Sequence, residues 1–511
     1  MRFGAFLNNT TVVKSGFSPQ NGSIRCSVRS LRTSGGSSFK LTSPYKPNTR
    51  VVSKLPFAER LLIWLRSLQP GRLETLQKQL VELSFPMEAE ENRGVTRDFV
   101  KTPVDDAGNV INSVTFEVAN NPDADTRHVV FIHGYGASLG CFARNFHLIN
   151  QFKGLNHNYK VHFLDNLSFG LSSNPGISSV DYWKPIPKID HIKLNDPSPN
   201  DKTNLHKKYY KLIDSYDFNT EKFHAYSARM KPVLQDMEAY YADALEAWRK
   251  NSRIDKIHFL VGHSFGGYWS GSYALKYPGS LRNLVLLSPV GVERHATAVT
   301  APIPQKTAQL QPSLDPSSYA FLSRWPILSK DTVRRWYNVQ PYLPRLLKFM
   351  GPFGVSKYYD MWYGKLFAVN KVIQRLGGET VFTSTNQLKY GTNTECKLLI
   401  EYLYNSITSG TKSDTHVKYL LTPATTSKWP LMEKFACASG DTLAKFNTHV
   451  VYGQYDFMCS EAGEKMVEEI NSSHEAVDAR FHTVPEGGHN LYIQNPFGTN
   501  ELIEKLVREE D

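Results

Sequence analysis

The segment that most restricts the fold of this chain is residues 257–273, which read IHFLVGHSFGGYWSGSY. A short apolar run stops at Gly-His-Ser-Phe-Gly-Gly, and a second apolar run begins at once. This pattern predicts a buried strand, a tight turn and then a helix from about Phe265 to Tyr277. Gly262 and Gly266 stand two residues to either side of Ser264, because larger side chains at these positions of such a turn would clash with neighbouring backbone. The turn either closes a core element or presents the Ser264 hydroxyl to a substrate.

Two later loops offer the groups that would activate this serine. A serine hydroxyl is a poor nucleophile unless a neighbouring base takes its proton. The segment THVVYGQYDFM places Asp456 beyond one late predicted strand, and FHTVPEGGHNLY places His489 in a glycine-rich loop after the last strand. The order serine, acid, histidine matches the chain order of triads built on this kind of turn. We therefore predict a catalytic triad of Ser264, Asp456 and His489.

A second requirement is a pair of N–H groups that can hold a developing oxyanion. The loop HGYGAS follows an early apolar strand, and its glycines allow a close backbone approach. We expect the backbone amides of Tyr135 and Phe265 to form this oxyanion hole. The residues predicted to shape the supporting turns are His133, Gly134, Gly262 and Gly266. We expect His263 and Glu486 to support loops, and Asp165 to be structural.

Metal and cofactor sites have little support in the sequence. His191 and His206 have no Cys or His partner at ligand spacing, and no Walker-type phosphate loop is present. The five cysteines are scattered, which is typical of a reducing compartment. We therefore predict a reaction that requires no metal and no organic cofactor.

Strand and helix patterns alternate over most of the chain, which predicts an α/β fold with a mostly parallel central sheet flanked by helices. We place the first part of the core at 95–292, with a polar surface insertion at 174–227. Residues 293–440 lose the strand pattern and mix aromatic with basic residues, so we predict an inserted helical cap there. The second part of the core is predicted at 441–511.

The N-terminal region has an uneven charge. Residues 1–58 contain nine Lys or Arg and no Asp or Glu, and they are rich in Ser and Thr. This composition predicts a disordered mitochondrial transit peptide, with an untargeted basic tail as the alternative. Because the rest of the chain is nearly balanced in charge, the net charge of +11 does not indicate nucleic-acid binding.

Residues 59–94 are predicted to form amphipathic helices separated by Pro70-Gly71. Two interpretations remain open: the helices pack on the core, or they lie on a membrane surface through Ile63, Trp64 and Leu65. No run of 18 apolar residues occurs, so any predicted membrane contact is peripheral.

The sequence resembles the α/β-hydrolase superfamily across about residues 95–511. The resemblance is carried by HGYGAS, LDNLSFGLSS, GHSFGGY, YGQYDFM and PEGGHNLY. It is most similar to the lipid-metabolising branch that contains the lipase co-activator, the N-acyl-phosphatidylethanolamine lysolipases and the fungal mitochondrial cardiolipin-specific deacylases. The resemblance implies a phospholipid substrate, cardiolipin deacylated to monolysocardiolipin, and a peripheral position on the matrix side of the mitochondrial inner membrane.

Other functions stay open. Members of this branch often carry H-x-x-x-x-D at the catalytic histidine, a motif linked to lysophosphatidate acyl transfer, whereas Gln494 stands five residues after His489 here. An acyltransferase and a non-catalytic lipid-binding partner of another lipase are the alternatives. The predicted cap holds aromatic and basic residues that either suit an acyl chain with an anionic headgroup or simply pack as a helical cap: Trp325, Arg334, Arg335, Trp336 and Trp362.

Overall fold

The computed structural model describes residues 55–195, 214–322, 343–375, 390–423 and 425–511. All but the last four residues of the predicted transit peptide lie outside these ranges. The same is true of several other residues that the sequence singled out: His206, Trp325, Arg334, Arg335 and Trp336.

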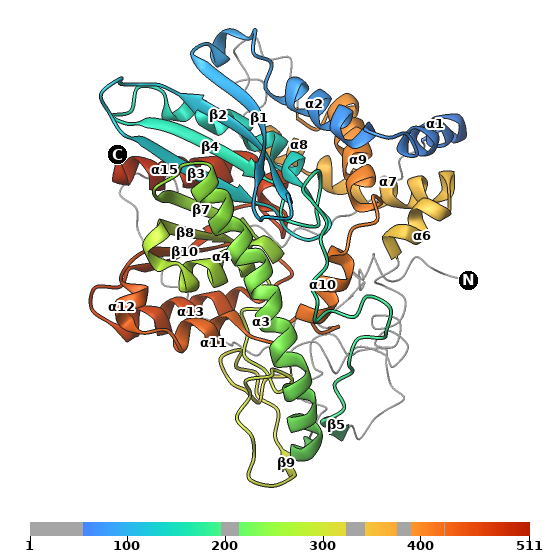
Figure 1. The fold of residues 1–511 in the computed structure, drawn as a ribbon, viewed down its shortest axis with the longest axis vertical. Coiled ribbons are helices and arrows are strands. Elements are labelled where there is room, and N and C mark those ends of the chain that lie inside the picture. Colours follow the sequence, from blue (N-terminus) through green and yellow to red (C-terminus); the bar gives the residue numbers. More distant parts are fainter. Residues whose placement is uncertain (1–54, 196–213, 323–342, 376–389, 424) are drawn as a thin grey trace, which may run out of the picture. The chain divides into compact units, whose positions relative to one another are not determined.

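An eight-stranded sheet forms the centre of the fold (Figure 1). Its strands, in spatial order, are β1 (Val95–Pro103), β2 (Val110–Val118), β4 (Asn158–Leu164), β3 (Thr126–Ile132), β7 (Ile257–His263), β8 (Leu281–Leu287), β10 (Asn447–Gly453) and β11 (Ala479–Val484). The β1–β2 and β2–β4 pairs are antiparallel, and every other pair is parallel. The predicted α/β class with a mostly parallel sheet is confirmed.

Helices cover both faces of this sheet because its central strands are apolar on both sides. Along β3, Val129 and Phe131 belong to one buried cluster, whereas Val130 and Ile132 belong to the other. The first cluster contains η3 (Leu139–Phe152) and α15 (Pro496–Glu510), and the second contains α3 (Thr220–Asn251) and α4 (Phe265–Lys276). The short elements η2 (Glu90–Asn92) and η5 (Pro278–Ser280) lie in connections.

Residues 174–227, which we predicted to be a polar surface insertion, contain two strands and the start of a helix. It contributes β5 (Ile192–Asn195) and β6 (Ser215–Phe218), which form a small antiparallel sheet with β9 (Ala308–Leu310). Its last residues belong to α3, which begins at Thr220 rather than near residue 227. His191 is buried, with its ring 5.0–5.3 Å from three aromatic rings, those of Phe218, Phe223 and Tyr226. Long-range packing therefore makes part of this segment core.

Helices dominate the described part of the chain between β8 and β10. They are α6 (Leu343–Phe349), α7 (Pro352–Leu366), α8 (Val369–Arg375), α9 (Asn393–Ile407), α10 (Ser413–Leu420), α11 (Leu431–Ala436) and α12 (Gly440–Leu443). Trp362, expected as a candidate lipid-facing residue, is instead buried in the core. The remaining helices, α13 (Ser460–Ser473) and α14 (Leu491–Gln494), follow β10 and β11.

A buried ion pair joins the predicted cap to the core. The Arg144 guanidinium on η3 donates to both carboxylate oxygens of Glu395 on α9, at 2.7 and 2.8 Å. The same guanidinium donates to the backbone carbonyls of Leu366 and Ile493. One buried cation therefore holds together the core, the predicted cap and the short helix that follows His489.

The N-terminal helices pack against helices of the cap. These are α1 (Phe57–Ser67) and α2 (Arg72–Ser84), which contact α7 and α9 respectively. The Trp64 indole N–H donates to the Lys348 carbonyl at 2.9 Å, and Ile63 is buried. Of the residues that suggested a membrane face, Ile63 and Trp64 thus turn inward and Leu65 is exposed. No helix in the described ranges has the length and apolar character needed to cross a bilayer.

Candidate active site

Ser264 occupies the turn between β7 and α4 with φ 52° and ψ −113°. A non-glycine residue at positive φ is strained, and such strain is kept where the surrounding structure demands it. Close packing of the backbone around the turn holds Ser264 in this conformation. A Cβ at Gly266 would lie 2.3 Å from the His133 carbonyl oxygen, and one at Gly262 would lie 2.4 Å from Ser270 Oγ. Both positions therefore require glycine.

The structure brings the three predicted triad residues together. His489 Nε2 lies 3.0 Å from Ser264 Oγ, and His489 Nδ1 lies 3.1 Å from Asp456 Oδ1. These side chains follow β7, β10 and β11, whose carboxyl ends meet at one edge of the sheet. The arrangement has the nucleophile, base and orienting acid within hydrogen-bond reach of one another.

The carboxylate of Asp456 decides which nitrogen of His489 carries a proton. Burial raises the pKa of Asp456, but the hydrogen bond and charge of His489 and the amide of Met458 outweigh it, so its pKa lies below the usual value. An ionised carboxylate only accepts hydrogen bonds, so Nδ1 of His489 is the donor. Nε2 is thereby left with a lone pair toward Ser264 Oγ.

Neighbouring side chains hold the His489 loop in place. Burial lowers the pKa of His263 to about 3, so its imidazole is neutral and donates from Nε2 to the His489 carbonyl at 2.8 Å. Gln494 Oε1 accepts from the Gly488 amide at 3.0 Å. The Glu486 amide donates to Gln454 Oε1, and its carboxylate pairs with Arg375. Gln494, which stands where the H-x-x-x-x-D motif has its aspartate, thus holds the loop of His489 in place through its side-chain amide oxygen.

The two predicted oxyanion amides belong to the turn of the nucleophile and to the loop that packs against it. Phe265 is the first residue of α4, so its N–H has no acceptor within the helix. Among the turns and loops that the structure describes, no carbonyl accepts from the Tyr135 amide. A Cβ at Gly134 would lie 3.0 Å from Ser264 Cβ, which places this loop directly against the nucleophile. The geometry suits a tetrahedral oxyanion beside Ser264.

His133 and Asp165 shape the loop from behind. Burial lowers the pKa of His133 to about 4, so the ring is neutral; Nε2 accepts from the Asn166 amide and Nδ1 donates to the Gly134 carbonyl. Burial raises the pKa of Asp165 to about 6, while its oxygens accept from Leu139, Leu171 and Asn112. Neither residue contacts the triad by these bonds, so both act on loop geometry.

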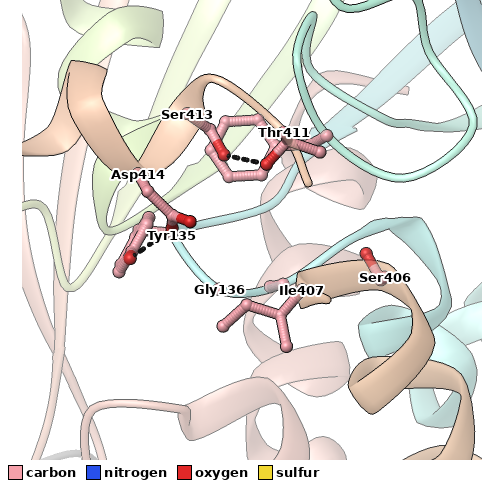
Figure 2. Close-up of a pocket in the computed structure, with 9 residues that line it drawn as sticks. Tyr135, Gly136, Ser406, Ile407, Thr411, Ser413 and Asp414 are labelled. Carbon is pink, nitrogen blue, oxygen red and sulfur yellow. Dashed lines mark hydrogen bonds between the residues drawn. The ribbon is translucent and has the colours of Figure 1, made fainter. Parts of the chain in front are cut away.

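A feature that the sequence did not reveal lies on the other side of Tyr135 (Figure 2). The Tyr135 hydroxyl donates to Asp414 Oδ1 at 2.6 Å, and both line a pocket of about 210 Å³, a volume that includes space open to solvent. Lys418 Nζ lies 5.5 Å from the Tyr135 ring centroid. Burial raises the pKa of Asp414 and lowers that of Lys418. In the sequence, this i, i+4 pair is indistinguishable from a solvated pair on a helix surface.

Comparison with known proteins adds family evidence. A family model described as the alpha/beta hydrolase fold matches residues 127–496. The chain is 28% identical to the Saccharomyces cerevisiae protein ECM18, over 86% of this chain and 81% of that protein. It is 27% identical to the S. cerevisiae 1-acylglycerol-3-phosphate O-acyltransferase ICT1, over 72% of this chain and 78% of that protein. The chain is 22% identical to the rat 1-acylglycerol-3-phosphate O-acyltransferase ABHD5, over 75% of this chain and 78% of that protein.

Proposed function

This chain belongs to the alpha/beta-hydrolase fold family, and on that premise we propose that it is a serine acyl hydrolase that deacylates a phospholipid. The observation that carries the proposal is the continuous contact from Asp456 through His489 to Ser264, with distances of 3.1 and 3.0 Å. This contact joins a buried carboxylate, an oriented imidazole and a serine hydroxyl held in a strained turn.

The reaction proceeds in two halves. Ser264 Oγ attacks the ester carbonyl carbon while His489 Nε2 takes its proton, and the amides of Tyr135 and Phe265 hold the oxyanion. His489 then protonates the leaving alcohol oxygen, which departs as the lysophospholipid. In the second half, water attacks the acyl-serine ester while His489 takes a proton from it, and His489 then gives that proton to Ser264 Oγ as the fatty acid leaves.

The substrate and location are proposed from the sequence. The motifs LDNLSFGLSS and GHSFGGY are similar to those of cardiolipin deacylases, and residues 1–58 contain no acid. We therefore assign cardiolipin, deacylated to monolysocardiolipin in cardiolipin remodelling, as the first substrate to test. The proposed location is the matrix side of the mitochondrial inner membrane, where the protein would be peripherally bound.

The test uses purified protein and vesicles that contain cardiolipin, phosphatidylglycerol or phosphatidylcholine. We expect fatty acid and monolysocardiolipin to appear with the wild type, and turnover to fall by roughly 10⁴-fold or more in Ser264→Ala. A fluorophosphonate should label the wild type and leave Ser264→Ala unlabelled. Equal turnover in the two proteins contradicts the role of Ser264. Absence of both turnover and labelling in the wild type contradicts the triad and leaves a non-catalytic lipid-binding protein.

A second candidate is acyl transfer to a lysophospholipid. It is favoured by the similarity to ICT1, whose name describes it as a 1-acylglycerol-3-phosphate O-acyltransferase. The same acyl-serine would then be attacked by a lysophosphatidate hydroxyl in place of water. Incubation with acyl-CoA and lysophosphatidate distinguishes the two: phosphatidate indicates the transferase, whereas fatty acid alone indicates the hydrolase.

A further inference from the structure

Helix α1 presents an apolar face to the outside of the folded region. Its inward side carries Ile63 and Trp64, which contact α7 and the end of α6. Its outward side carries three exposed large apolar residues, Phe57, Leu62 and Leu65, and the exposed Leu68 follows directly after the helix. A helix packed on a globular surface normally shows polar residues outward, so this orientation requires an explanation.

The turn between α6 and α7 continues this apolar face. Phe349 is 89% exposed and Phe353 is 64% exposed, among the largest values for apolar residues in the described ranges. Figure 1 shows α1, α6 and α7 together at one side of the fold, and the hydrogen bond from Trp64 to Lys348 joins them. We call these six exposed residues (Phe57, Leu62, Leu65, Leu68, Phe349 and Phe353) the α1–α7 face.

The charge around the α1–α7 face is mostly positive. The basic residues on these three helices are Arg60, Arg66, Arg345, Lys348, Lys357 and Lys365. The acids on the same helices are Glu59, which pairs with Lys397 at 2.8 Å, and Asp360. Exposed apolar side chains on helices with an excess of Lys and Arg match the boundary between the acyl chains and headgroups of an anionic bilayer.

We propose that the α1–α7 face docks this protein on an anionic lipid bilayer. The charge pattern decides between occupants. A second copy would bring two positive faces together, and the acid-free residues 1–54 are themselves positive, so both would be repelled. An anionic membrane supplies the opposite charge together with an apolar layer for the leucine and phenylalanine side chains. This binding does not depend on the chemistry of Ser264.

The experiment measures co-sedimentation of the full chain with vesicles of phosphatidylcholine alone or mixed with phosphatidylglycerol. Leu62→Ser/Phe349→Ser removes two apolar side chains without a change in charge. We expect its partition coefficient on mixed vesicles to fall at least about tenfold. Leu314→Ser is the matched control, because Leu314 is 62% exposed outside this face, and it should bind like the wild type.

A second pair of substitutions tests the charges. Arg66→Gln/Lys357→Gln should weaken binding to mixed vesicles roughly fivefold or more and leave binding to phosphatidylcholine unchanged. All variants should hydrolyse a soluble short-chain ester at the wild-type rate, which confirms folding. The wild type could also lack ester hydrolysis while the variants still differ in vesicle binding as expected. That result would contradict the proposed function and support the docking surface.

Two results would overturn the proposal. One is equal vesicle binding by the wild type, Leu62→Ser/Phe349→Ser and Leu314→Ser. The other is a change in the solution mass of Leu62→Ser/Phe349→Ser with vesicle binding unaltered, which would identify the α1–α7 face as a contact between copies of this chain.

Discussion

The phenol of Tyr135 donates a 2.6 Å hydrogen bond to the carboxylate of Asp414, and this bond ties the loop after β3 to helix α10 (Figure 2). The backbone amide of the same tyrosine is one of the two candidate oxyanion donors. Asp414 is buried, so it has little access to water as a replacement partner. The orientation of the candidate oxyanion loop is thus coupled to the packing of the predicted cap.

Tyr135→Phe tests this coupling, because it removes the hydroxyl and keeps the backbone amide. We expect the free energy of unfolding to fall by about 1–3 kcal/mol, since Asp414 is left short of a buried donor. We expect kcat on a soluble ester to fall several-fold with little change in KM, because the loop loses a restraint while ester binding is retained. Tyr363→Phe, which loses an exposed hydroxyl, is the control. An unchanged kcat in Tyr135→Phe would show that the bond does not position the amide.

Asp456→Asn should lower kcat by about 10³–10⁴-fold while the fold persists. The carboxamide has the size of the carboxylate, but it can donate to His489 Nδ1 and favour the tautomer that carries the proton on Nε2. That tautomer cannot accept the Ser264 proton. Steady-state turnover and the rate of fluorophosphonate labelling should fall together. A loss of turnover with normal labelling would place the defect after the attack of Ser264.

The same carboxylate makes a prediction about stability and pH. The pKa of Asp456 in the folded protein lies below its ordinary value of 3.8, so the folded state releases this proton more readily than the unfolded state. Its contribution to stability is therefore complete above about pH 4 and is lost as the pH falls through the folded pKa. We expect the difference in unfolding free energy between the wild type and Asp456→Asn to shrink as the pH falls below about 4. Denaturant titrations at each pH measure it.

Gly266→Ala should prevent normal folding of the nucleophile turn. The added Cβ would lie 2.3 Å from the backbone oxygen of His133, which cannot move without shifting β3. We expect a loss of at least about 3 kcal/mol in the free energy of unfolding, together with loss of activity. Gly279→Ala is the control, because a Cβ there meets nothing within 4 Å. Thermal unfolding of the two variants compares them, and equal melting temperatures would contradict the close packing at Gly266.

Glu395→Gln should destabilise the protein by about 3–5 kcal/mol, because it leaves the buried Arg144 guanidinium without its counter-charge. Glu401→Gln is a milder control, since its partner Arg72 is less deeply buried. Urea unfolding gives both values. Because Arg144 also binds the Ile493 carbonyl, we expect ester hydrolysis in Glu395→Gln to be lost at a lower temperature than in the wild type. Similar stability of the two variants would show that the Arg144 pair is not the main link between core and cap.

Much of the fold could be predicted because its signals are local. The run IHFLVGHSFGGYW specifies strand, turn and helix through neighbouring residues alone, and these elements lie where the pattern predicts. Asp456 and His489 were identifiable since each follows a strong strand pattern in a glycine-containing loop. The strand β1 has no comparable local signal, because its side chains are mostly exposed and the segment has no clear alternation.

By itself, then, the sequence determined the local elements, their order and the three residues whose type and spacing suit acyl chemistry. Tertiary structure alone decided which faces are covered. It buried His191 and Trp362, set Asp414 against Tyr135, and turned Leu62 outward while Ile63 turned inward. The physical reason is that secondary structure depends on neighbours in the chain, whereas burial and the partner of a charge depend on residues that can be hundreds of positions away.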